Sequence, residues 1–343
     1  MQKVRRSLLL ACAMRYNTRM IGMHSLRVGV LRGGPSPEYE VSLATGKNVL
    51  ENLSDAFSPE DIFIDKAGVW HIAGVPVSPA DAAERIDVAF NALHGAYGED
   101  GALARELFAL GVPHTGARAF GCAAAMNKII AKEAARAAGV KTPSFVVVSR
   151  DDFSDEKAVD IFRSFPQPSV IKPAAAGSSF GVTIARDFPS LCAGIAEALR
   201  FSEKAVVEEY IAGKEASCGV VDDFRGEDIY ALPPIEIRPP HGKEFFDYEA
   251  KYAGETEEIC PGDFTAEEKR EMERAAKAVH EACGLRHYSR SDFIVSPRGV
   301  YFLEVNALPG LSSASLFPKA LDAVGASFAD FLTHVVSLAA EGK

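Results

Sequence analysis

Two apolar segments near the C-terminal end constrain the fold more than any other part of the chain. They read "HYSRSDFIVS" and "GVYFLEVNA" and are joined by turn-forming residues at 296 to 299, so they predict an antiparallel hairpin. Residues two apart share one face of a strand, so Arg290 and Asp292 should point the same way. Glu304 and Asn306 should share a face for the same reason. A register that pairs Asp292 with Glu304 also sets the other two opposite each other, whereas a one-residue slip would scatter all four.

These four side chains suggest a magnesium site. The carboxylates of Asp292 and Glu304 and the amide oxygen of Asn306 are the hard oxygen ligands that Mg2+ prefers, and Mg2+ usually keeps substrate phosphates in its shell. A surface hairpin carrying an Arg–Glu pair is the alternative, and either strand alone would favour it. Because both strands also carry apolar residues, the two strands taken together favour the metal site, and we expect Asp292, Glu304 and Asn306 to be metal ligands.

Composition limits the partners of the chain. Its 343 residues, 48% of them hydrophobic, are enough for two or three domains that each have a core. A net charge of -10 argues against sequence-independent binding to nucleic acid or to an anionic membrane, so any phosphate ligand should be small and locally bound. No segment approaches the roughly 20 apolar residues of a membrane span.

The cysteines indicate the compartment. All six are scattered, without a CxxC pair or the dense spacing of a disulfide framework, which is typical of a reducing compartment and predicts a cytoplasmic protein. His280 and Cys283 lie one helical turn apart, but no second ligand pair accompanies them. A packed or solvated helix face is therefore favoured over a zinc site.

The first 24 residues form a separate question. "MQKVRRSLLLAC" resembles an export or lipoprotein signal, but its apolar run is about half the usual length and Arg15 and Arg19 follow at once. We expect residues 1 to 24 to be a flexible extension or the result of an upstream start codon. The alternative start codons are Met14, Met20 and Met23.

Strand and helix patterns alternate along the chain and predict an α/β fold. A strand, a glycine turn and a helix open a doubly wound N-terminal domain over residues 25 to 119. A second unit starts with one helix over 123 to 140 and continues with the strands "SFVVVS" and "QPSVIKP" and the helix "FPSLCAGIAEALRF". The remainder is rich in strands, with a long polar loop at 238 to 262 and a helix over "TAEEKREMERAAKAVHEACG".

A glycine-serine loop, "VIKPAAAGSSFGV", places Lys172 at the end of a strand, before small residues whose N–H groups can approach an anion. It has neither the P-loop nor the Rossmann order, so a plain solvent loop is the alternative. Lys128 could be a second cation on the same phosphates, or a solvated charge. Glu208 and Glu215 could accept from an adenine amino group or ribose hydroxyls, although alone they would be surface charges.

Nine ordered motifs connect the chain to a known family. They are "GGPSPEYEVS", "HGAYGEDG", "MNKIIAK", "IKPAAAGSSFGV", "VEEYIAGKE", "DYEAKY", "CPGDF", "SRSDF" and "EVNALPGLSSASLFP". In this order they resemble the D-alanine:D-alanine ligases of the ATP-grasp superfamily, from about residue 26 to 340. The resemblance implies an ATP-grasp fold with an N-terminal doubly wound (preATP-grasp) domain, followed by a central domain at 120 to 206 and a C-terminal domain at 207 to 343.

The resemblance also implies roles for individual residues. The ATP site would consist of Lys128 and Lys172 at the phosphates, Glu208 and Ile211 at adenine, Glu215 at the ribose, Ser179 in a loop over the phosphates, and Lys251 at the γ-phosphate. The substrate site would consist of Glu40 at the ammonium of the first D-alanine, Ser178 and Tyr252 in support, and Ser315 and Leu316 at the carboxylate of the second. Arg290 and the N–H of Gly310 would stabilise the tetrahedral oxyanion.

By the same resemblance, the enzyme would be an ADP-forming carboxylate–amine ligase that makes D-alanyl-D-alanine for peptidoglycan through an acyl phosphate. It would use ATP and two Mg2+ ions, or Mn2+, and would act as a cytoplasmic homodimer. The polar loop at 238 to 262 would exclude water as a lid.

Some positions depart from the usual family pattern. Asn127 stands where Asp is usual, Ala175 and Ala176 where Arg and Glu are frequent, and Ala104 where Gln is common. "ALPGLS" also replaces the usual "TxPGMT" near the second subsite. The second substrate could therefore be D-lactate or another amino acid, although Tyr252 favours an amine. A nucleotide-binding protein without turnover is disfavoured, because the predicted metal ligands and phosphate cations are all present.

Overall fold

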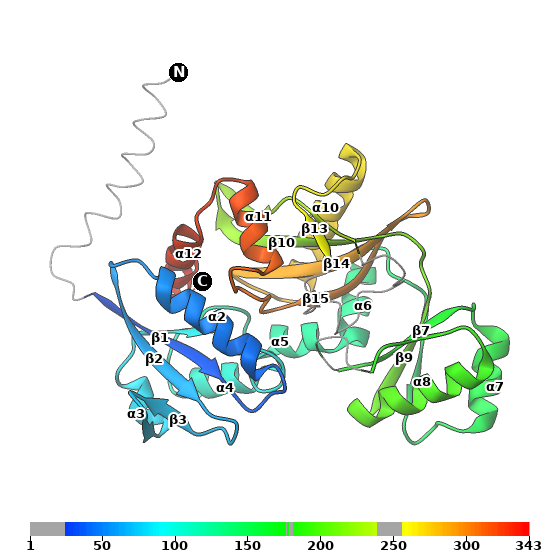
Figure 1. Ribbon diagram of the computed structural model, residues 1–343, viewed down its shortest axis with the longest axis horizontal. Helices are drawn as coiled ribbons and strands as arrows, with labels where there is room; N and C mark the ends of the chain where they lie inside the picture. The colour runs from blue at the N-terminus through cyan, green and yellow to red at the C-terminus, as the bar shows by residue number, and fades with distance from the viewer. Residues whose placement is uncertain (1–24, 176, 178–180, 239–255, 343) are drawn as a thin grey trace.

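The computed structural model describes residues 25 to 175, 177, 181 to 238 and 256 to 342. Three sheets organise this part of the chain (Figure 1). The first sheet and its helices lie at the lower left of that view, the second sheet lies at the lower right, and the third lies above and between them. Expected segments that fall outside these ranges are the N-terminal extension and most of the polar loop.

The first sheet has the order β4-β3-β2-β1-β5. β1 is parallel to both β2 and β5, while β3 and β4 add an antiparallel edge, as expected for a doubly wound unit with a short extension. Its strands are β1 (Leu26–Gly33), β2 (Phe57–Ile64), β3 (Trp70–Ile72), β4 (Val75–Val77) and β5 (Val88–Asn91), and its helices are α2 (Tyr39–Asn52), α3 (Pro79–Ala83) and α4 (Ala102–Ala109).

The second sheet is antiparallel and has the order β6-β9-β7-β8. Helices α7 and α8 pack together, and α8 covers β7, β8 and β9. The strands are β6 (Phe145–Ser149), β7 (Ser169–Pro173), β8 (Thr183–Ala185) and β9 (Lys204–Glu209), and the helices are α7 (Asp155–Ser164) and α8 (Phe188–Phe201).

The third sheet has the order β13-β12-β10-β14-β15, with β11 paired to β10. Its strands are β10 (Lys214–Phe224), β11 (Glu227–Ala231), β12 (Ile235–Arg238), β13 (Glu257–Ile259), β14 (Tyr288–Ser296) and β15 (Gly299–Asn306). The remaining helices are α5 (Ala119–Met126), α6 (Lys128–Ala137), α10 (Ala266–Ala282), α11 (Leu316–Ala323) and α12 (Phe328–Glu341). β12 ends at Arg238, where the expected polar loop begins, and β13 lies within the span expected for that loop.

The helix expected over 123 to 140 is in fact two helices. α5 ends at Met126 and α6 begins at Lys128, and Asn127 between them is extended. The Asn127 side chain accepts hydrogen bonds from the backbone N–H groups of Ile129 and Ile130, which makes it the N-cap of α6. The break fixes where α6 starts, and therefore where its lysines lie.

The hydrophobic cores divide the chain at other positions than the expected domain boundaries do. Residues 117 to 140 contribute Cys122, Ala125 and Ala131 to the core of the third sheet, beside Phe293 and Phe302, rather than to the second sheet. The boundary expected at 206 falls within β9, which pairs with β6 and β7 through residue 209. The second sheet is therefore a smaller unit than predicted, and α5 and α6 belong with the third.

A separate core joins the first sheet to the C-terminal helices. Val30 and Phe90 of the first sheet pack in one cluster with Phe317 of α11 and Phe331 of α12.

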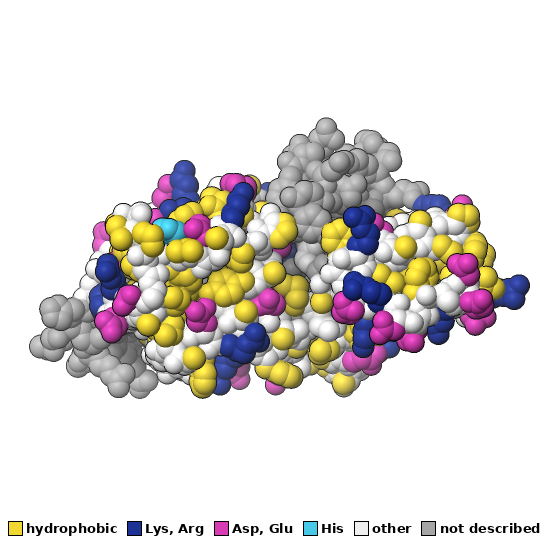
Figure 2. All heavy atoms as spheres, turned by 90° about the horizontal axis from the view of Figure 1, so that it is seen from below, with side chains coloured by type: hydrophobic (Ala, Val, Ile, Leu, Met, Phe, Trp, Pro, Cys, Tyr) yellow, Lys and Arg dark blue, Asp and Glu magenta, His cyan; other side chains and the backbone are white. Residues whose placement is uncertain are grey.

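Among the described residues, no single helix is long and apolar enough to span a membrane. Helices α11 and α12 taken together would meet the criteria of length and composition, but the pair is bent by 105°. Figure 2, the view from below, shows Lys and Arg side chains interspersed with Asp and Glu side chains and with hydrophobic side chains.

Candidate active site

A cavity of about 270 Å3 lies where loops of the first sheet meet β14, β15 and the start of α11. Parts of the chain more than 200 residues apart supply its wall, because the first sheet and α11 share a core. Residues from the predicted site and others that the sequence did not indicate both line it. Those used below are Glu38, His94, Glu99, Gly177, Arg290, Asp292, Glu304, Asn306, Gly310, Ser315 and Leu316.

The β14–β15 hairpin has the register that the predicted site requires. Asp292 pairs with Glu304 and Arg290 with Asn306, and a register shift follows between Asp292 and Phe293. We call Arg290, Asp292, Glu304 and Asn306 the hairpin cluster. All four line the cavity, so their predicted convergence is confirmed.

Asp292 is the centre of the hairpin cluster. Arg290 binds it through two hydrogen bonds, from Nε to Oδ1 at 3.0 Å and from Nη2 to Oδ2 at 2.9 Å. Asn306 Nδ2 donates to Oδ2 at 3.1 Å, and the Ser217 hydroxyl donates to Oδ1 at 2.6 Å. Burial disfavours the charged form of Arg290, but the Asp292 carboxylate outweighs it, so the pKa of the guanidinium lies above its ordinary value.

The hairpin cluster fits a hard divalent cation by its donor set. Asp292, Glu304 and Asn306 offer carboxylate and amide oxygens to one cavity. Within the described residues, no group of three or more His, Cys, Asp or Glu is placed to hold a metal. The amide oxygen and ligand phosphates would therefore complete the shell, as is usual for Mg2+.

The N-terminal half of α6 provides two lysines on one face. Lys128 and Lys132 are four residues apart, and their exposed fractions are 8% and 0%. Lys128 Nζ lies 3.2 Å from Glu304 Oε2, which links α6 to the hairpin cluster. Lys132 Nζ lies 3.2 Å from Glu208 Oε1.

Lys132 and Lys172 each contact one oxygen of the Glu208 carboxylate, and we call these three residues the lysine cluster. Lys172 Nζ donates to Glu208 Oε2 at 3.1 Å, so each carboxylate oxygen has its own ammonium partner. Burial raises the pKa of Glu208, but the two ammonium groups more than offset it and the pKa lies below its ordinary value. Burial lowers the pKa of Lys132 to about 8.

The remaining nucleotide candidates lie around the lysine cluster. Glu208 is in β9, Ile211 is buried just after it, and Glu215 is in β10. For Lys172, burial lowers the pKa, but the negative charges of Glu208, Glu304 and Glu215 outweigh it and raise the pKa overall. Ser178, Ser179, Lys251 and Tyr252 lie outside the described residues.

Glu40, which was expected at the ammonium of the first D-alanine, lies away from the cavity. Glu40 lies in the first turn of α2, is exposed and is absent from the cavity wall, whereas Glu38 lines the cavity. A Cβ atom added to Gly177 would lie 3.0 Å from Glu38 Oε2, and one added to Gly95 would lie 2.6 Å from it. The sequence offered two glutamates in "EYE", and the start of α2 turns the first of them to the cavity.

A pair in the same cavity wall as Glu38, the buried His94 and the partly buried Glu99, was not predicted from the sequence. His94 Nδ1 lies 3.0 Å from Glu99 Oε1, and His94 Nε2 lies 2.9 Å from the Thr45 hydroxyl. Burial raises the pKa of Glu99, and the hydrogen bond with His94 opposes this only in part. Both residues lie in "HGAYGEDG", so the motif was the available signal, but no spacing rule assigned them a role.

The start of α11 closes the opposite wall of the cavity. Ser315 is its N-cap residue and Leu316 its first residue, so backbone N–H groups at this end can attract an anion. The Ser315 hydroxyl lies 2.8 Å from that of Ser312. A Cβ added to Gly310 would lie 3.0 Å from Ser315 Oγ, so glycine gives the backbone a close approach here.

Comparisons with known proteins identify the family of the chain. The family model described as "D-ala D-ala ligase C-terminus" matches residues 134 to 337, which is more than half of the chain. The D-alanine–D-alanine ligase of Geotalea uraniireducens is 39% identical over 317 residues, covering 92% of this chain and 96% of that protein. That of Geobacter sulfurreducens is 40% identical over 321 residues, covering 92% and 94%. The chain belongs to the D-alanine–D-alanine ligase family.

Solved structures support the same assignment. The VanG D-Ala:D-Ser ligase from Enterococcus faecalis has a TM-score of 0.82 and 30% identity, covering 92% of this chain and 100% of that chain. The D-alanyl-alanine synthetase A from Vibrio cholerae has a TM-score of 0.81 and 25% identity, covering 93% and 100%. This member of the ligase family therefore has the expected α/β ATP-grasp fold.

Proposed function

We propose that this family member joins two molecules of D-alanine at the expense of ATP, giving D-alanyl-D-alanine, ADP and phosphate for peptidoglycan synthesis. The observation that carries the proposal is the convergence of the hairpin cluster on one cavity, with Lys128 of α6 in contact with it and Lys172 of β7 nearby. An enzyme of this class must neutralise phosphate charge and stabilise an oxyanion in the same enclosed place.

The nucleotide would lie along the lysine cluster, with its phosphates directed to the hairpin. Lys128 and Lys172 would donate to phosphate oxygens, Glu208 and Ile211 would contact adenine, and Glu215 would contact the ribose. Asp292, Glu304 and Asn306 would hold Mg2+, which offsets charge on the transferring phosphoryl group. Lys128 already lies beside Glu304, so the phosphate and metal positions are adjacent.

The first D-alanine would be oriented by Glu38, whose carboxylate accepts hydrogen bonds from the substrate ammonium. A carboxylate oxygen of that substrate attacks the γ-phosphorus and ADP leaves, which produces an acyl phosphate. Segments of the first sheet and of the third sheet both line the cavity, and enclosure of this kind would protect the intermediate from water.

The second D-alanine would place its carboxylate at Ser315 and Leu316, at the start of α11. Its free amine attacks the acyl carbon, phosphate leaves with the electrons of the carbon–oxygen bond, and the amine loses a proton. Arg290 and the N–H of Gly310 would donate to the oxyanion that forms between these steps. Arg290 is suited to this because its charge is fixed by Asp292.

Phosphate release from ATP tests the reaction class. We expect release to require D-alanine, with D-alanyl-D-alanine identified as the product by mass spectrometry. L-alanine or D-lactate should not replace D-alanine. Release only with a different acceptor, or a mixed product from D-alanine and D-serine or D-lactate, would contradict the proposal. Absence of release with every acid would also contradict it.

Metal removal tests the cofactor. We expect EDTA to abolish phosphate release and Mg2+ or Mn2+ to restore it. In Asp292→Asn the Mg2+ concentration needed for half-maximal activity should rise, because one of two carboxylate ligands is lost. Full activity in EDTA would exclude the metal site.

We propose further that the ligase is a homodimer in the cytoplasm. The two most exposed aromatic side chains, Phe108 and Phe120, flank an apolar cavity of about 520 Å3 on one face of the described chain. Exposed aromatic side chains beside an apolar cavity suit a two-fold contact, in which the aromatic side chains of each chain pack against the cavity of the other. Sedimentation of Phe108→Asp should show monomers where the unmodified chain shows dimers.

The proposed compartment is supported by the cysteines. The five cysteines within the described residues are free thiols, which suits a reducing compartment.

A further inference from the structure

Lys132 is the one lysine within the described residues with no exposed surface at all, and the proposed mechanism gives it no role. A lysine is almost never fully buried unless a partner compensates for the loss of water. Lys132 has two partners, Glu208 Oε1 at 3.2 Å and the Thr142 hydroxyl at 3.0 Å. The Thr142 hydroxyl in turn donates to the carbonyl of Phe302 in β15.

The partner of Lys132 is shared with a phosphate-binding candidate. Lys172 donates to the other oxygen of Glu208, so in the structure Glu208 is balanced by two ammonium groups. If Lys172 turns toward ATP phosphates, its contact with Glu208 weakens. A buried carboxylate that loses its only cation is strongly destabilised, so Glu208 would retain Lys172 unless a second cation stayed in place.

We propose that Lys132 is a positioning residue for the nucleotide site, which holds Glu208 ionised and oriented while Lys172 transfers to the phosphates of ATP. This inference rests on the proposed ATP-dependent function and deepens it. Lys132 itself contacts no substrate, and it acts through Glu208.

The same contact would influence which purine is accepted. An ionised Glu208 can accept a hydrogen bond from the 6-amino group of adenine, but it repels the 6-oxo group of guanine. If Glu208 lost its fixed ammonium partner, it would either retain Lys172 or take up a proton. A protonated carboxyl can donate to an oxo group, so discrimination against GTP should weaken.

Lys132→Met tests the proposal, because methionine keeps the chain length and removes the charge. We expect the KM for ATP to rise about tenfold, as for loss of a charge-assisted contact, with kcat and the KM for D-alanine changed less than about twofold. The ratio of kcat/KM for ATP over GTP should fall. Lys132→Arg should restore part of the KM and the selectivity, because it restores a fixed cation.

Thr142→Val is the matched control. It removes the other partner of Lys132 without changing the size of the side chain much, and it leaves the contact with Glu208 in place. A role limited to packing would make Thr142→Val and Lys132→Met resemble each other, with lowered thermal stability and unchanged nucleotide selectivity. That outcome, or an unchanged KM for ATP in Lys132→Met, would overturn the proposal.

Glu208→Gln keeps the test decisive if Lys132→Met does not fold. The double variant Lys132→Met/Glu208→Gln removes one ammonium together with the carboxylate, and the negative charges of Glu304 and Glu215 still favour the charged form of Lys172, so this variant should fold. If Lys132 acts through Glu208, Lys132→Met should add no further loss of ATP affinity to Glu208→Gln. An additive loss would contradict the proposal.

Equilibrium binding separates this inference from the proposed function. Displacement of a fluorescent ATP analogue by ATP or GTP measures nucleotide selectivity without turnover. If the parent chain made no D-alanyl-D-alanine but Lys132→Met still lost selectivity for ATP, only the proposed function would fail. If the parent chain made the dipeptide and Lys132→Met bound ATP and GTP as before, only the role of Lys132 would fail.

Discussion

The hairpin cluster and the lysine cluster carry the same kinds of charge, but the chain assembles them in different ways. The hairpin cluster comes from two strands joined by a short turn, so one register sets all its members at once. The lysine cluster comes from α6, β7 and β9, and its members are up to 76 residues apart in sequence, from Lys132 to Glu208. A local site tolerates little change of register, whereas a dispersed site depends on how three elements pack.

The two clusters also differ in what they leave available to a ligand. Asp292 already accepts from Arg290, Asn306 and Ser217, and its residue is partly exposed to the cavity. Glu208 is 1% exposed and has an ammonium on each oxygen. Changes in the hairpin cluster should therefore affect the chemical step, and changes in the lysine cluster should affect nucleotide binding.

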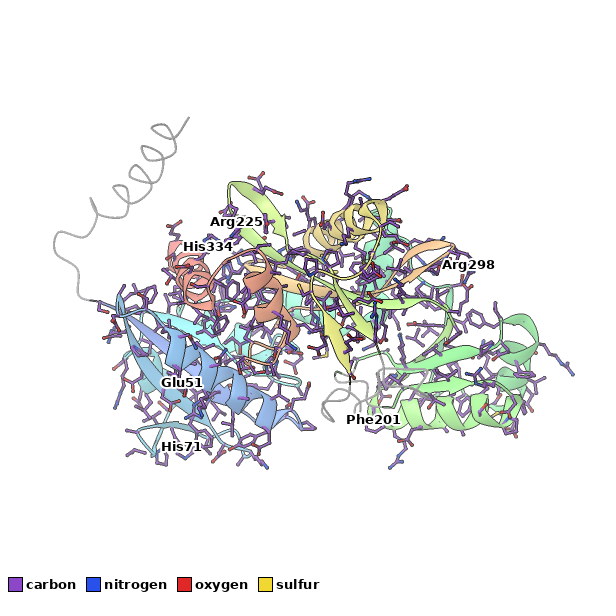
Figure 3. The ribbon with its side chains drawn as sticks, turned by 45° about the horizontal axis from the view of Figure 1, so that its top comes forward. Glu51, His71, Phe201, Arg225, Arg298 and His334 are labelled. Atoms are coloured by element: carbon purple, nitrogen blue, oxygen red, sulfur yellow. The ribbon has the colours of Figure 1, made fainter. Side chains whose placement is uncertain are left out.

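Arg290→Met should produce the largest effect. We expect kcat to fall roughly 100- to 1,000-fold, the magnitude typical for loss of an oxyanion donor, while the KM for ATP changes far less. Steady-state kinetics with varied ATP and saturating D-alanine give both values. A matched control is Arg225→Met, since Arg225 lies at the β10–β11 turn, away from the cavity (Figure 3). An effect confined to the KM for ATP would place Arg290 in the nucleotide site instead.

Glu38→Gln should have the next largest effect. A carboxylate that binds an ammonium contributes a charge-assisted hydrogen bond, so its loss should raise the KM for the first D-alanine about tenfold or more. Glu40→Gln is the control, because Glu40 is exposed on α2 and does not line the cavity. If Glu40→Gln raised the KM and Glu38→Gln did not, the assignment by geometry would be wrong.

The sequence predicted the hairpin cluster well because its physical basis is local. Alternation fixes the face of each side chain, and the turn at 296 to 299 fixes the register. No local rule of this kind separates Glu38 from Glu40, and the expectation for Glu40 came from the family resemblance alone. They are two residues apart at the start of a helix, where neither alternation nor helical spacing applies yet, and only the position of the N-terminal residues of α2 decides which one faces the cavity.

Long-range packing explains the other differences. Lys132 could not be distinguished from a solvated helix charge, because its burial depends on β9 and on the segment at Thr142. The boundary inside β9 was missed because strand patterns show where a strand lies, but not which sheet it joins. Arg298, at the turn of the β14–β15 hairpin (Figure 3), links the third sheet to the second, because it forms an ion pair of 2.7 Å with Glu209 of β9.

Gly310→Ala should have a smaller effect and should act on the second substrate. The added Cβ would lie 3.0 Å from Ser315 Oγ, so the hydroxyl must move by a few tenths of an ångström. Overpacking of this kind costs about 1 kcal/mol, which corresponds to roughly fivefold in the KM for the second D-alanine. Substrate-inhibition and initial-rate analysis can separate the two D-alanine constants. Gly68→Ala is the control. A Cβ added to Gly68 would meet no atom within 4 Å, and the positive φ of 84° means that this variant introduces backbone strain without overpacking.

A pH profile should give the smallest effect and the most direct comparison of the clusters. Burial lowers the pKa of Lys132 to about 8, while Glu208 and Glu304 favour its charged form and Lys172 opposes it. As pH rises through this value, Lys132 loses its charge and Glu208 is left with Lys172 alone, so kcat/KM for ATP should fall. The fall should stay below the roughly tenfold effect expected for Lys132→Met.

Two controls accompany this profile. Lys132→Arg should not show the fall in kcat/KM, because a guanidinium remains charged. Arg290 stays charged throughout, so kcat at saturating ATP should not share this inflection. The same inflection in Lys132→Arg would mean that another group titrates and that the lysine cluster does not control ATP binding.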